Sequence, residues 1–358
     1  MKKISFYGLL CAFFTATVCS LVACNSTKEQ EQTKLSIVTT IYPEYAWTKE
    51  ILGSRADSVN LTLLMKNGVD LHSYKPTAQD IAKIASADMV VYVGGESDEW
   101  IKDALEASPK KGRSEINLME ALGDRVKAEE VVEGMQGETK EDAEENHEHV
   151  EHAEEHEHHE HHDEHAEEHH HHHDHEEEVE NDEHVWLSLK NAEILVQKIA
   201  AELAKKDSAH ATLYTENAKD YIAKIQSLDA EYRTTIDSAA RKTVLFGDRF
   251  PFRYLVDDYG IKYYAAFVGC SAESEASFET IAFLAWKMDS LSLPAIFTIE
   301  KGNQKIARAI LEASKSSKEA KVLTINSMQS VTEQQIAEGF SYLSIMESNL
   351  EVLKQAIK

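Results

Sequence analysis

One stretch of this 358-residue chain cannot belong to a folded core. Fifteen of its 18 histidines lie between His147 and His175, interleaved with acidic residues and including the run His169 to His173. From Glu138 to Glu183 the chain carries 22 acidic residues and a single basic one, Lys140. Such a segment has too little apolar surface to fold by itself. We therefore predict a flexible loop inserted into a chain that folds around it.

The composition of this loop indicates metal binding. Imidazole is a common ligand for zinc, copper and nickel, and carboxylates add harder ligand character. The alternative is a solvated acidic spacer with no specific ligand. The formal charge is −26, and the acids and the base counted above account for −21 of it, which leaves about −5 for the rest. Because a strongly acidic protein repels nucleic acid, we expect no nucleic-acid partner.

The N-terminus has the pattern of a secretory signal. Lys2 and Lys3 precede an apolar run that ends in Leu21-Val22-Ala23-Cys24. The cysteine directly after Leu-Val-Ala resembles a bacterial lipobox, which implies a signal peptide over 1–23, a lipidated Cys24 and a tether over 24–34. A plain signal peptide and a membrane anchor are the alternatives. We expect an extracytoplasmic protein, lipid-anchored to the bacterial membrane.

The cysteines are consistent with this interpretation. Cys11 and Cys19 leave with the signal peptide and Cys24 carries lipid, so that Cys270 remains alone and no intrachain disulfide can form in the mature chain. A single cysteine is usually a small buried hydrophobic residue. We favour that reading of Cys270 over a thiolate metal ligand.

Apolar runs and helical patterns alternate in both halves of the chain, which favours parallel sheets with crossover helices. In the first half we predict strands over 35–41, 59–64 and 89–93, with helices over 43–52 and 77–85. In the second half we predict strands over 243–246, 261–265, 295–299 and 322–325, with helices over 252–259, 277–291, 305–314 and 333–356.

Between the halves, residues 188–205 and 209–239 are predicted to be helical, and the second helix contains no proline or glycine. At about 1.5 Å per residue it spans roughly 45 Å, enough to bridge two domains. The predicted fold is α/β, with two lobes of mainly parallel sheets joined by one long rigid helix. The predicted boundaries are 35–187 for the N-terminal lobe, with the loop over 136–183 inside it, 188–240 for the connecting helices and 241–358 for the C-terminal lobe.

Two histidines outside the loop stand in distinctive segments. His72 lies in Val69-Asp70-Leu71-His72-Ser73-Tyr74-Lys75-Pro76-Thr77, and His184 lies in Asn181-Asp182-Glu183-His184-Val185-Trp186-Leu187. Ligands in open α/β sheets bind beyond the carboxyl ends of the strands, which makes polar residues there the site candidates. Each histidine alone could have a structural role, but the two segments together favour a shared site.

Both segments resemble the metal-binding subunits of bacterial metal ABC transporters, the cluster A-I solute-binding proteins. The first matches that family's His-x-Tyr-x-Pro-(Thr/Ser) motif, and the second its Asp-x-His-(Val/Ile)-Trp-(Leu/Met) motif. Zinc-specific members carry a His-acid loop between these motifs, where this chain's loop stands. The resemblance implies a metal site in the interlobe cleft with His72 and His184 as ligands.

The chain departs from this family pattern in its second half. The third family ligand, a His or Glu, falls at Gly247, and the fourth, an Asp, falls near Asn326. Because a closed zinc site wants about four ligands, replacements are needed. We consider Asp248, next to the lost ligand, and Glu300, at the end of a predicted strand, where the missing bulk of Gly247 would leave room. A loop histidine or water, and less strongly Glu273 and Glu275, are further candidates.

The predicted function is capture of Zn²⁺ outside the membrane and its delivery to a metal ABC permease with its ATPase, by a monomer that is not an enzyme. The imidazole-rich loop favours zinc over manganese, which prefers harder oxygen ligands. Manganese or another divalent ion is the alternative cargo. A secreted zinc hydrolase is a second class of function, but the sequence contains no His-Glu-x-x-His motif. A surface metal store or adhesin is a third.

Overall fold

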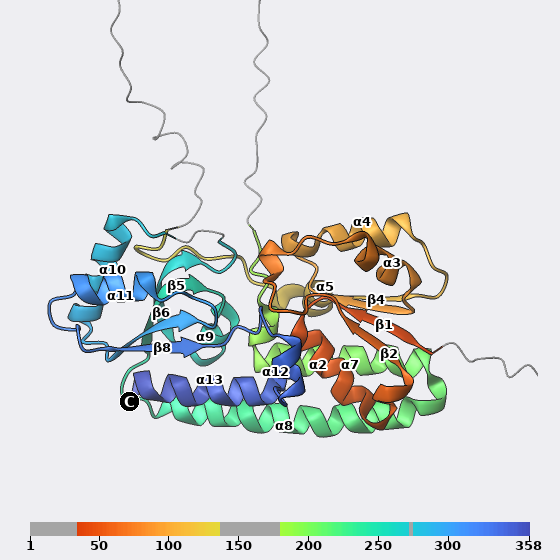
Figure 1. Ribbon diagram of the computed structural model, residues 1–358. Helices are drawn as coiled ribbons and strands as arrows, with labels where there is room; N and C mark the ends of the chain where they lie inside the picture. Colours follow the sequence, from red (N-terminus) through yellow and green to blue (C-terminus); the bar gives the residue numbers. More distant parts are fainter. Residues whose placement is uncertain (1–33, 137–179, 272–274) are drawn as a thin grey trace, which may run out of the picture. The chain divides into compact units, whose positions relative to one another are not determined.

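The computed structural model describes residues 34–136, 180–271 and 275–358 (Figure 1). The predicted lipobox, most of the histidine-rich loop and Glu273 lie outside these residues. Residues Leu35–Lys358 form one compact unit. In the described part of the chain, no helix has both the length and the apolar character that crossing a membrane requires.

The first lobe is built on a sheet of four parallel strands in the order β2-β1-β3-β4. β3 is buried along its whole length, as expected for a short apolar run in a parallel sheet. Its strands are β1 (Ser36–Thr39), β2 (Asn60–Leu63), β3 (Met89–Tyr92) and β4 (Ser114–Asn117), and its helices are α2 (Tyr42–Leu52), α3 (Ala78–Ser86), α4 (Trp100–Ala107) and α5 (Leu118–Leu122). α4, β4 and α5 are not among the predicted elements.

The second lobe repeats the arrangement with the parallel order β6-β5-β7-β8. Its strands are β5 (Thr243–Phe250), β6 (Lys262–Val268), β7 (Ala295–Ile299) and β8 (Lys321–Ile325), and its helices are α9 (Arg253–Tyr259), α10 (Phe278–Ser290), α11 (Lys305–Ala313), α12 (Glu333–Ala337) and α13 (Tyr342–Ile357). The single helix predicted over 333–356 is wrong, because Gly339 between α12 and α13 has a φ of +96°, which a helix cannot contain.

Two long helices, α7 (Leu189–Lys206) and α8 (Ala211–Asp237), connect the lobes. The 27 residues of α8 span about 40 Å. Its buried side chains recur every three or four residues, from Tyr214 to Ile236. α8 packs on α7 and α2 at one end and on α9 and α13 at the other, as Figure 1 shows. The predicted fold class, two α/β lobes with a long connecting helix, is therefore confirmed.

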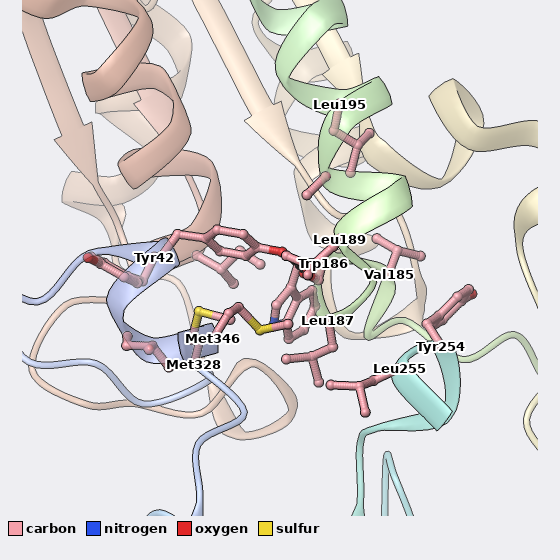
Figure 2. Packing of buried hydrophobic residues seen from close by; sticks show 14 of the residues in the cluster. Tyr42, Val185, Trp186, Leu187, Leu189, Leu195, Tyr254, Leu255, Met328 and Met346 are labelled. Carbon is pink, nitrogen blue, oxygen red and sulfur yellow. Dashed lines mark hydrogen bonds between the residues drawn. The ribbon is translucent and has the colours of Figure 1, made fainter. Parts of the chain in front are cut away.

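The lobes also share a hydrophobic core around Trp186, which is fully buried (Figure 2). The Trp186 indole donates a hydrogen bond to the Ser327 carbonyl at 2.8 Å, and the Tyr342 hydroxyl donates one to the Trp186 carbonyl at 2.8 Å. Ser327 and Tyr342 belong to the second lobe, whereas Trp186 is part of the first-lobe motif that contains His184. The core therefore fixes the segment that carries His184 against both lobes.

The stretch before the histidine-rich loop crosses to the second sheet. Gln136 donates its backbone N–H to the Ala266 carbonyl at 2.9 Å, and its side-chain oxygen accepts from the Ser277 backbone at 2.9 Å. The predicted boundaries place this stretch in the first lobe. Its contacts show that the chain has reached the second lobe at Gln136, the first residue of the predicted loop.

Candidate metal centre

His184 is held in place by the carboxylate of Asp182. It is fully buried, and its backbone N–H and its ring Nδ1 both bond to the same Asp182 oxygen, at 2.8 and 2.9 Å. Because a carboxylate only accepts hydrogen bonds, Nδ1 carries the proton. Nε2 therefore presents a lone pair. A carboxylate behind a histidine in this way is a common outer partner of metal-bound imidazoles.

His72 is oriented by an equivalent set of contacts. It lies in a short 3-10 turn, Leu71–Ser73, whose N-cap residue Asp70 accepts the His72 backbone N–H at 3.0 Å. Its Nδ1 lies 2.7 Å from the Ser97 hydroxyl oxygen and 3.6 Å from a Glu183 carboxylate oxygen. The Glu183 oxygen has no hydrogen-bond partner among the described residues. We assign the His72 proton to Nδ1, toward this carboxylate, which leaves the Nε2 lone pair free.

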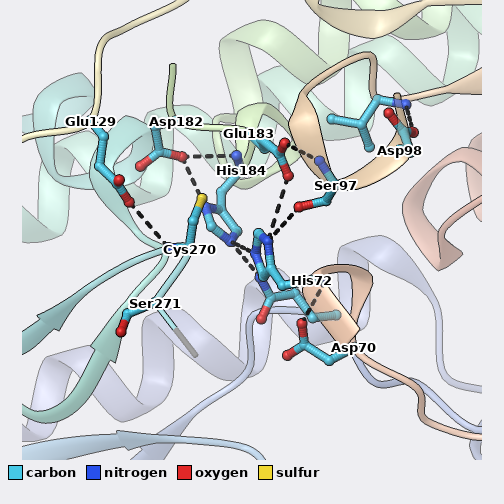
Figure 3. Close-up of polar contacts among 12 residues, drawn as sticks. Asp70, His72, Ser97, Asp98, Glu129, Asp182, Glu183, His184, Cys270 and Ser271 are labelled. Atoms are coloured by element: carbon cyan, nitrogen blue, oxygen red, sulfur yellow. Dashed lines mark hydrogen bonds and ion pairs between the residues drawn. The ribbon is translucent and has the colours of Figure 1, made fainter. Parts of the chain in front are cut away.

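The two Nε2 atoms face each other at 3.1 Å (Figure 3). Burial of His72, followed by the proximity of His184, lowers the pKa of His72 from 6.5 to about 3. The imidazole is therefore neutral at physiological pH, which is its metal-binding form. Two opposed lone pairs in a dry site attract a cation placed between them.

Two buried acids of the first lobe, Asp98 and Glu44, have raised pKa values. Burial, with Glu183 nearby, raises the pKa of Asp98 to about 7, although the Val93 and Gly94 backbone N–H groups both donate to it at 2.8 Å. Burial, with Asp98 nearby, raises the pKa of Glu44 well above its usual value. Burial therefore favours the neutral form of both carboxyl groups.

Two residues of the second lobe approach the pair. Sγ of Cys270 and one ring nitrogen from each histidine all lie within 4.8 Å of one another. The side-chain nitrogen of Gln329 lies 3.2 Å from His72 Nε2 and also contacts His184 Nε2. Sequence reasoning gave Cys270 a core role and did not consider Gln329. Their positions just beyond β6 and β8, at the carboxyl ends of parallel strands, were the available signal.

Asp248 and Glu300, the predicted replacement ligands, lie elsewhere. With Arg249 and Lys301 they line a cavity of about 370 Å³. Asp248 accepts the backbone N–H groups of Arg249 and Ile299 at 2.9 and 3.2 Å. Glu300 accepts the backbone N–H and the hydroxyl of Ser327, both at 2.8 Å. The structure brings His72 and His184 together but does not bring these carboxylates to them, so their role as ligands stays a prediction.

The space expected at Gly247 is not there. A side-chain carbon added to Gly247 would lie 2.6 Å from the Ala307 Cα in α11, so the glycine serves close packing and leaves no hole for Glu300. At Asn326, the side-chain oxygen accepts the Met328 backbone N–H at 2.8 Å. Both positions serve local structure in the second lobe.

An ion pair links the lobes beside the histidines. The Arg249 guanidinium donates to Asp70 at 2.6 Å, and both side chains are less than one-fifth exposed. The other Asp70 oxygen accepts the His72 backbone N–H. Desolvation opposes ionisation of Asp70, but Arg249 outweighs it and lowers the Asp70 pKa. The second lobe therefore helps to position the first-lobe ligand.

Two known proteins are similar to this chain over nearly its whole length. The chain is 35% identical over 358 residues to the zinc-binding lipoprotein AdcA of Streptococcus pneumoniae (strain ATCC BAA-255 / R6), covering 99% of this chain and 61% of that protein. It is 30% identical over 351 residues to the high-affinity zinc uptake system protein ZnuA of Bacillus subtilis (strain 168), covering 98% and 96%. The chain thus spans about three-fifths of AdcA and nearly all of ZnuA.

Solved structures resemble the fold over most of its length. The Zn(II)-bound ZnuA-like domain of Streptococcus pneumoniae AdcA matches with a TM-score of 0.64 at 28% identity, covering 90% of this chain and 99% of that one. The metal-dependent lipoprotein YcdH of Bacillus subtilis matches with a TM-score of 0.65 at 28% identity, covering 91% and 100%. Residues 37–356 match the family described as "Zinc-uptake complex component A periplasmic". With its paired histidines and two α/β lobes, this chain belongs to that zinc-uptake component A family.

Proposed function

We propose that this protein captures Zn²⁺ outside the cytoplasm and delivers it to an ABC permease and its ATPase. One observation carries the proposal: two imidazoles, one fully buried and the other nearly so, whose Nε2 atoms face each other at 3.1 Å while both Nδ1 atoms have acceptors. Tetrahedral zinc with Zn–N bonds of about 2.0–2.1 Å separates two nitrogens by roughly 3.4 Å. The spacing of the pair is therefore close to that of two nitrogens bound to one zinc ion.

The cargo follows from the donor atoms. Nitrogen donors suit zinc, whereas manganese, the alternative cargo, prefers oxygen. The zinc-binding names of the relatives support the same ion. The histidine-rich loop would raise the local zinc concentration through many weak sites, and a lipid on Cys24 would keep the protein at the membrane. The family description names a component of an uptake complex, which supports a binding protein rather than an enzyme.

Zinc titration tests this proposal. The parent protein is the full chain with the 15 loop histidines replaced by serine, so that the remaining strong site is isolated. Competition with a chromophoric chelator at pH 7.5 should show one tight zinc site in the parent and none in His72→Ala with His184→Ala. Equal affinity in the two proteins would refute the proposal.

The chain offers a matched control for this experiment. His210 also bonds through Nδ1 to a carboxylate, Asp207, at 2.9 Å, but it lies between α7 and α8, away from the pair. His210→Ala should leave zinc affinity unchanged. Zinc uptake by cells that carry the double variant should fall to the level of cells lacking the protein, and unchanged uptake would contradict the transport role.

A further inference from the structure

We propose that the second lobe completes the metal site with Cys270, through its sulfur, and Gln329, through its side-chain oxygen. The ion is then held by two nitrogens, one sulfur and one oxygen. This inference rests on the proposed function, because it names the ligands that the histidine pair lacks. Closed zinc sites take four N, O or S ligands in a tetrahedron, and the two histidines supply half of them.

Cys270 is within reach of the ion. A tetrahedral site with a Zn–S bond of about 2.3 Å separates sulfur from nitrogen by roughly 3.6 Å. The sulfur and both histidine nitrogens already lie within 4.8 Å of one another, so shifts on the order of 1 Å complete the geometry. The Cys270 backbone N–H is fixed on Glu129 at 3.1 Å.

The neighbour of Cys270 allows this approach. A side-chain carbon on Gly269 would lie 3.0 Å from the His184 ring carbon Cε1, closer than ordinary contact permits. The absence of a side chain at Gly269 therefore lets the β6 end approach the His184 ring. Figure 3 shows the sulfur beside that ring.

Gln329 lies against both histidine rings. Its side-chain nitrogen contacts Nε2 of both histidines, so that its two N–H groups serve the two lone pairs. Its oxygen is buried and has no hydrogen-bond partner in the described part of the chain, and the residue is only 4% exposed. An unpaired buried acceptor costs about 1–3 kcal/mol. A flip of the amide turns this oxygen toward an entering cation.

Zinc binding at this site releases one proton and places one negative charge on the ligands. As the bond to zinc forms, the Cys270 S–H bond breaks and its proton passes to solvent. The ligands then carry one negative charge against two positive charges on the ion, and the Asp182 and Glu183 carboxylates behind the rings offset the remainder. Because sulfur and nitrogen donors select zinc over manganese, magnesium and calcium, this ligand set also gives the site its specificity.

X-ray absorption at the zinc edge tests the cysteine without altering the site. The protein is the full chain with Cys11, Cys19, Cys24 and the 15 loop histidines replaced by serine, so that Cys270 is its only sulfur outside methionine. With one equivalent of zinc we expect one sulfur neighbour at about 2.3 Å. A shell of nitrogen and oxygen alone would overturn the inference.

Cobalt substitution gives a second readout. Thiolate-to-cobalt charge transfer in the near ultraviolet should appear in this protein, disappear in Cys270→Ser and persist in the neighbouring control Ser271→Ala. If the visible cobalt bands depend on His72 and His184 but charge transfer is absent, Cys270 is not a ligand and the proposed function stands. If neither histidine matters to cobalt or zinc binding, the proposed function itself fails.

The amide is tested separately. Gln329→Met keeps the length of the side chain but removes its oxygen, and should weaken zinc binding by about tenfold. Gln329→Glu supplies an anionic oxygen and should bind at least as tightly as the parent. Undiminished zinc affinity in Gln329→Met would show that the amide oxygen is not a ligand.

Discussion

The hydrogen bond behind His184 offers a quantitative test of the site. Asp182 is 2% exposed and holds both the backbone N–H and Nδ1 of His184 on one oxygen. Replacing it with asparagine preserves the shape but removes the charge. The amide can also present its N–H₂ group to the ring, which favours the tautomer that places the proton on Nε2, where the metal should bind.

We therefore expect Asp182→Asn to weaken zinc binding by about 10- to 100-fold, the usual effect of losing an outer-shell partner. This range corresponds to about 1.4–2.7 kcal/mol. It agrees with the roughly 1.5–3 kcal/mol attributed to a hydrogen bond with a charged group. The assay is chelator competition in the protein whose loop histidines are serine.

Asp207→Asn is the matched control, because Asp207 holds His210 Nδ1 at the same distance of 2.9 Å but lies outside the site. It should change zinc affinity by less than about twofold, since its carboxylate contacts no proposed ligand. If Asp182→Asn binds zinc as tightly as Asp207→Asn does, the argument that Asp182 fixes the tautomer of a metal ligand is wrong.

Three further outcomes are expected. The pKa of His72 is about 3 in the folded protein and about 6.5 when unfolded, so the unfolded state alone takes up this proton between those values. The metal-free protein should lose up to about 1.4 kcal/mol of stability per pH unit as pH falls through that window, and urea titrations should show a shallower slope for His72→Gln. Gly247→Ala should cost about 1–3 kcal/mol, seen as a lower urea midpoint, because its new carbon would overlap Ala307. Arg249→Met should lower both the urea midpoint and zinc affinity, because it leaves Asp70 buried without its 2.6 Å partner; an unchanged midpoint would show that this ion pair contributes nothing.

The part of the site that sequence could predict lies in the first lobe. His72 and His184 each sit in a contiguous motif that also contains the residue capping or orienting them, Asp70 and Asp182. Local sequence therefore determines both the ligand and its support. The long helix, the two-lobe arrangement and every described strand except β4 follow in the same way from the pattern of apolar residues.

The roles of Asp248 and Arg249 in the second lobe were harder to predict, because they depend on register. β5 contains a bulge: Phe246 pairs with Ala265, but Arg249, three residues later, pairs with Phe267, only two residues later. An extra residue in one strand changes which side chains face a given side. Arg249 therefore reaches Asp70, whereas Asp248 turns toward its own lobe. No periodicity in a single sequence reveals such a bulge.

The geometry of the histidine pair bears on how the protein can both capture and release an ion. The histidines are already 3.1 Å apart and held by acceptors, so binding costs little ordering of the first lobe and a high affinity can follow. The side-chain nitrogen of Gln329, however, donates to both lone pairs. The incoming ion must displace those hydrogen bonds, and the departing ion regains them. An internal competitor of this kind lowers the affinity but also stabilises the emptied site, so that release leaves no opposed lone pairs unpaired. A side chain at position 329 that cannot donate hydrogen bonds to the rings should therefore slow the transfer of zinc to a chelator by more than its effect on zinc affinity explains. Stopped-flow measurements on Gln329→Glu would show whether it does.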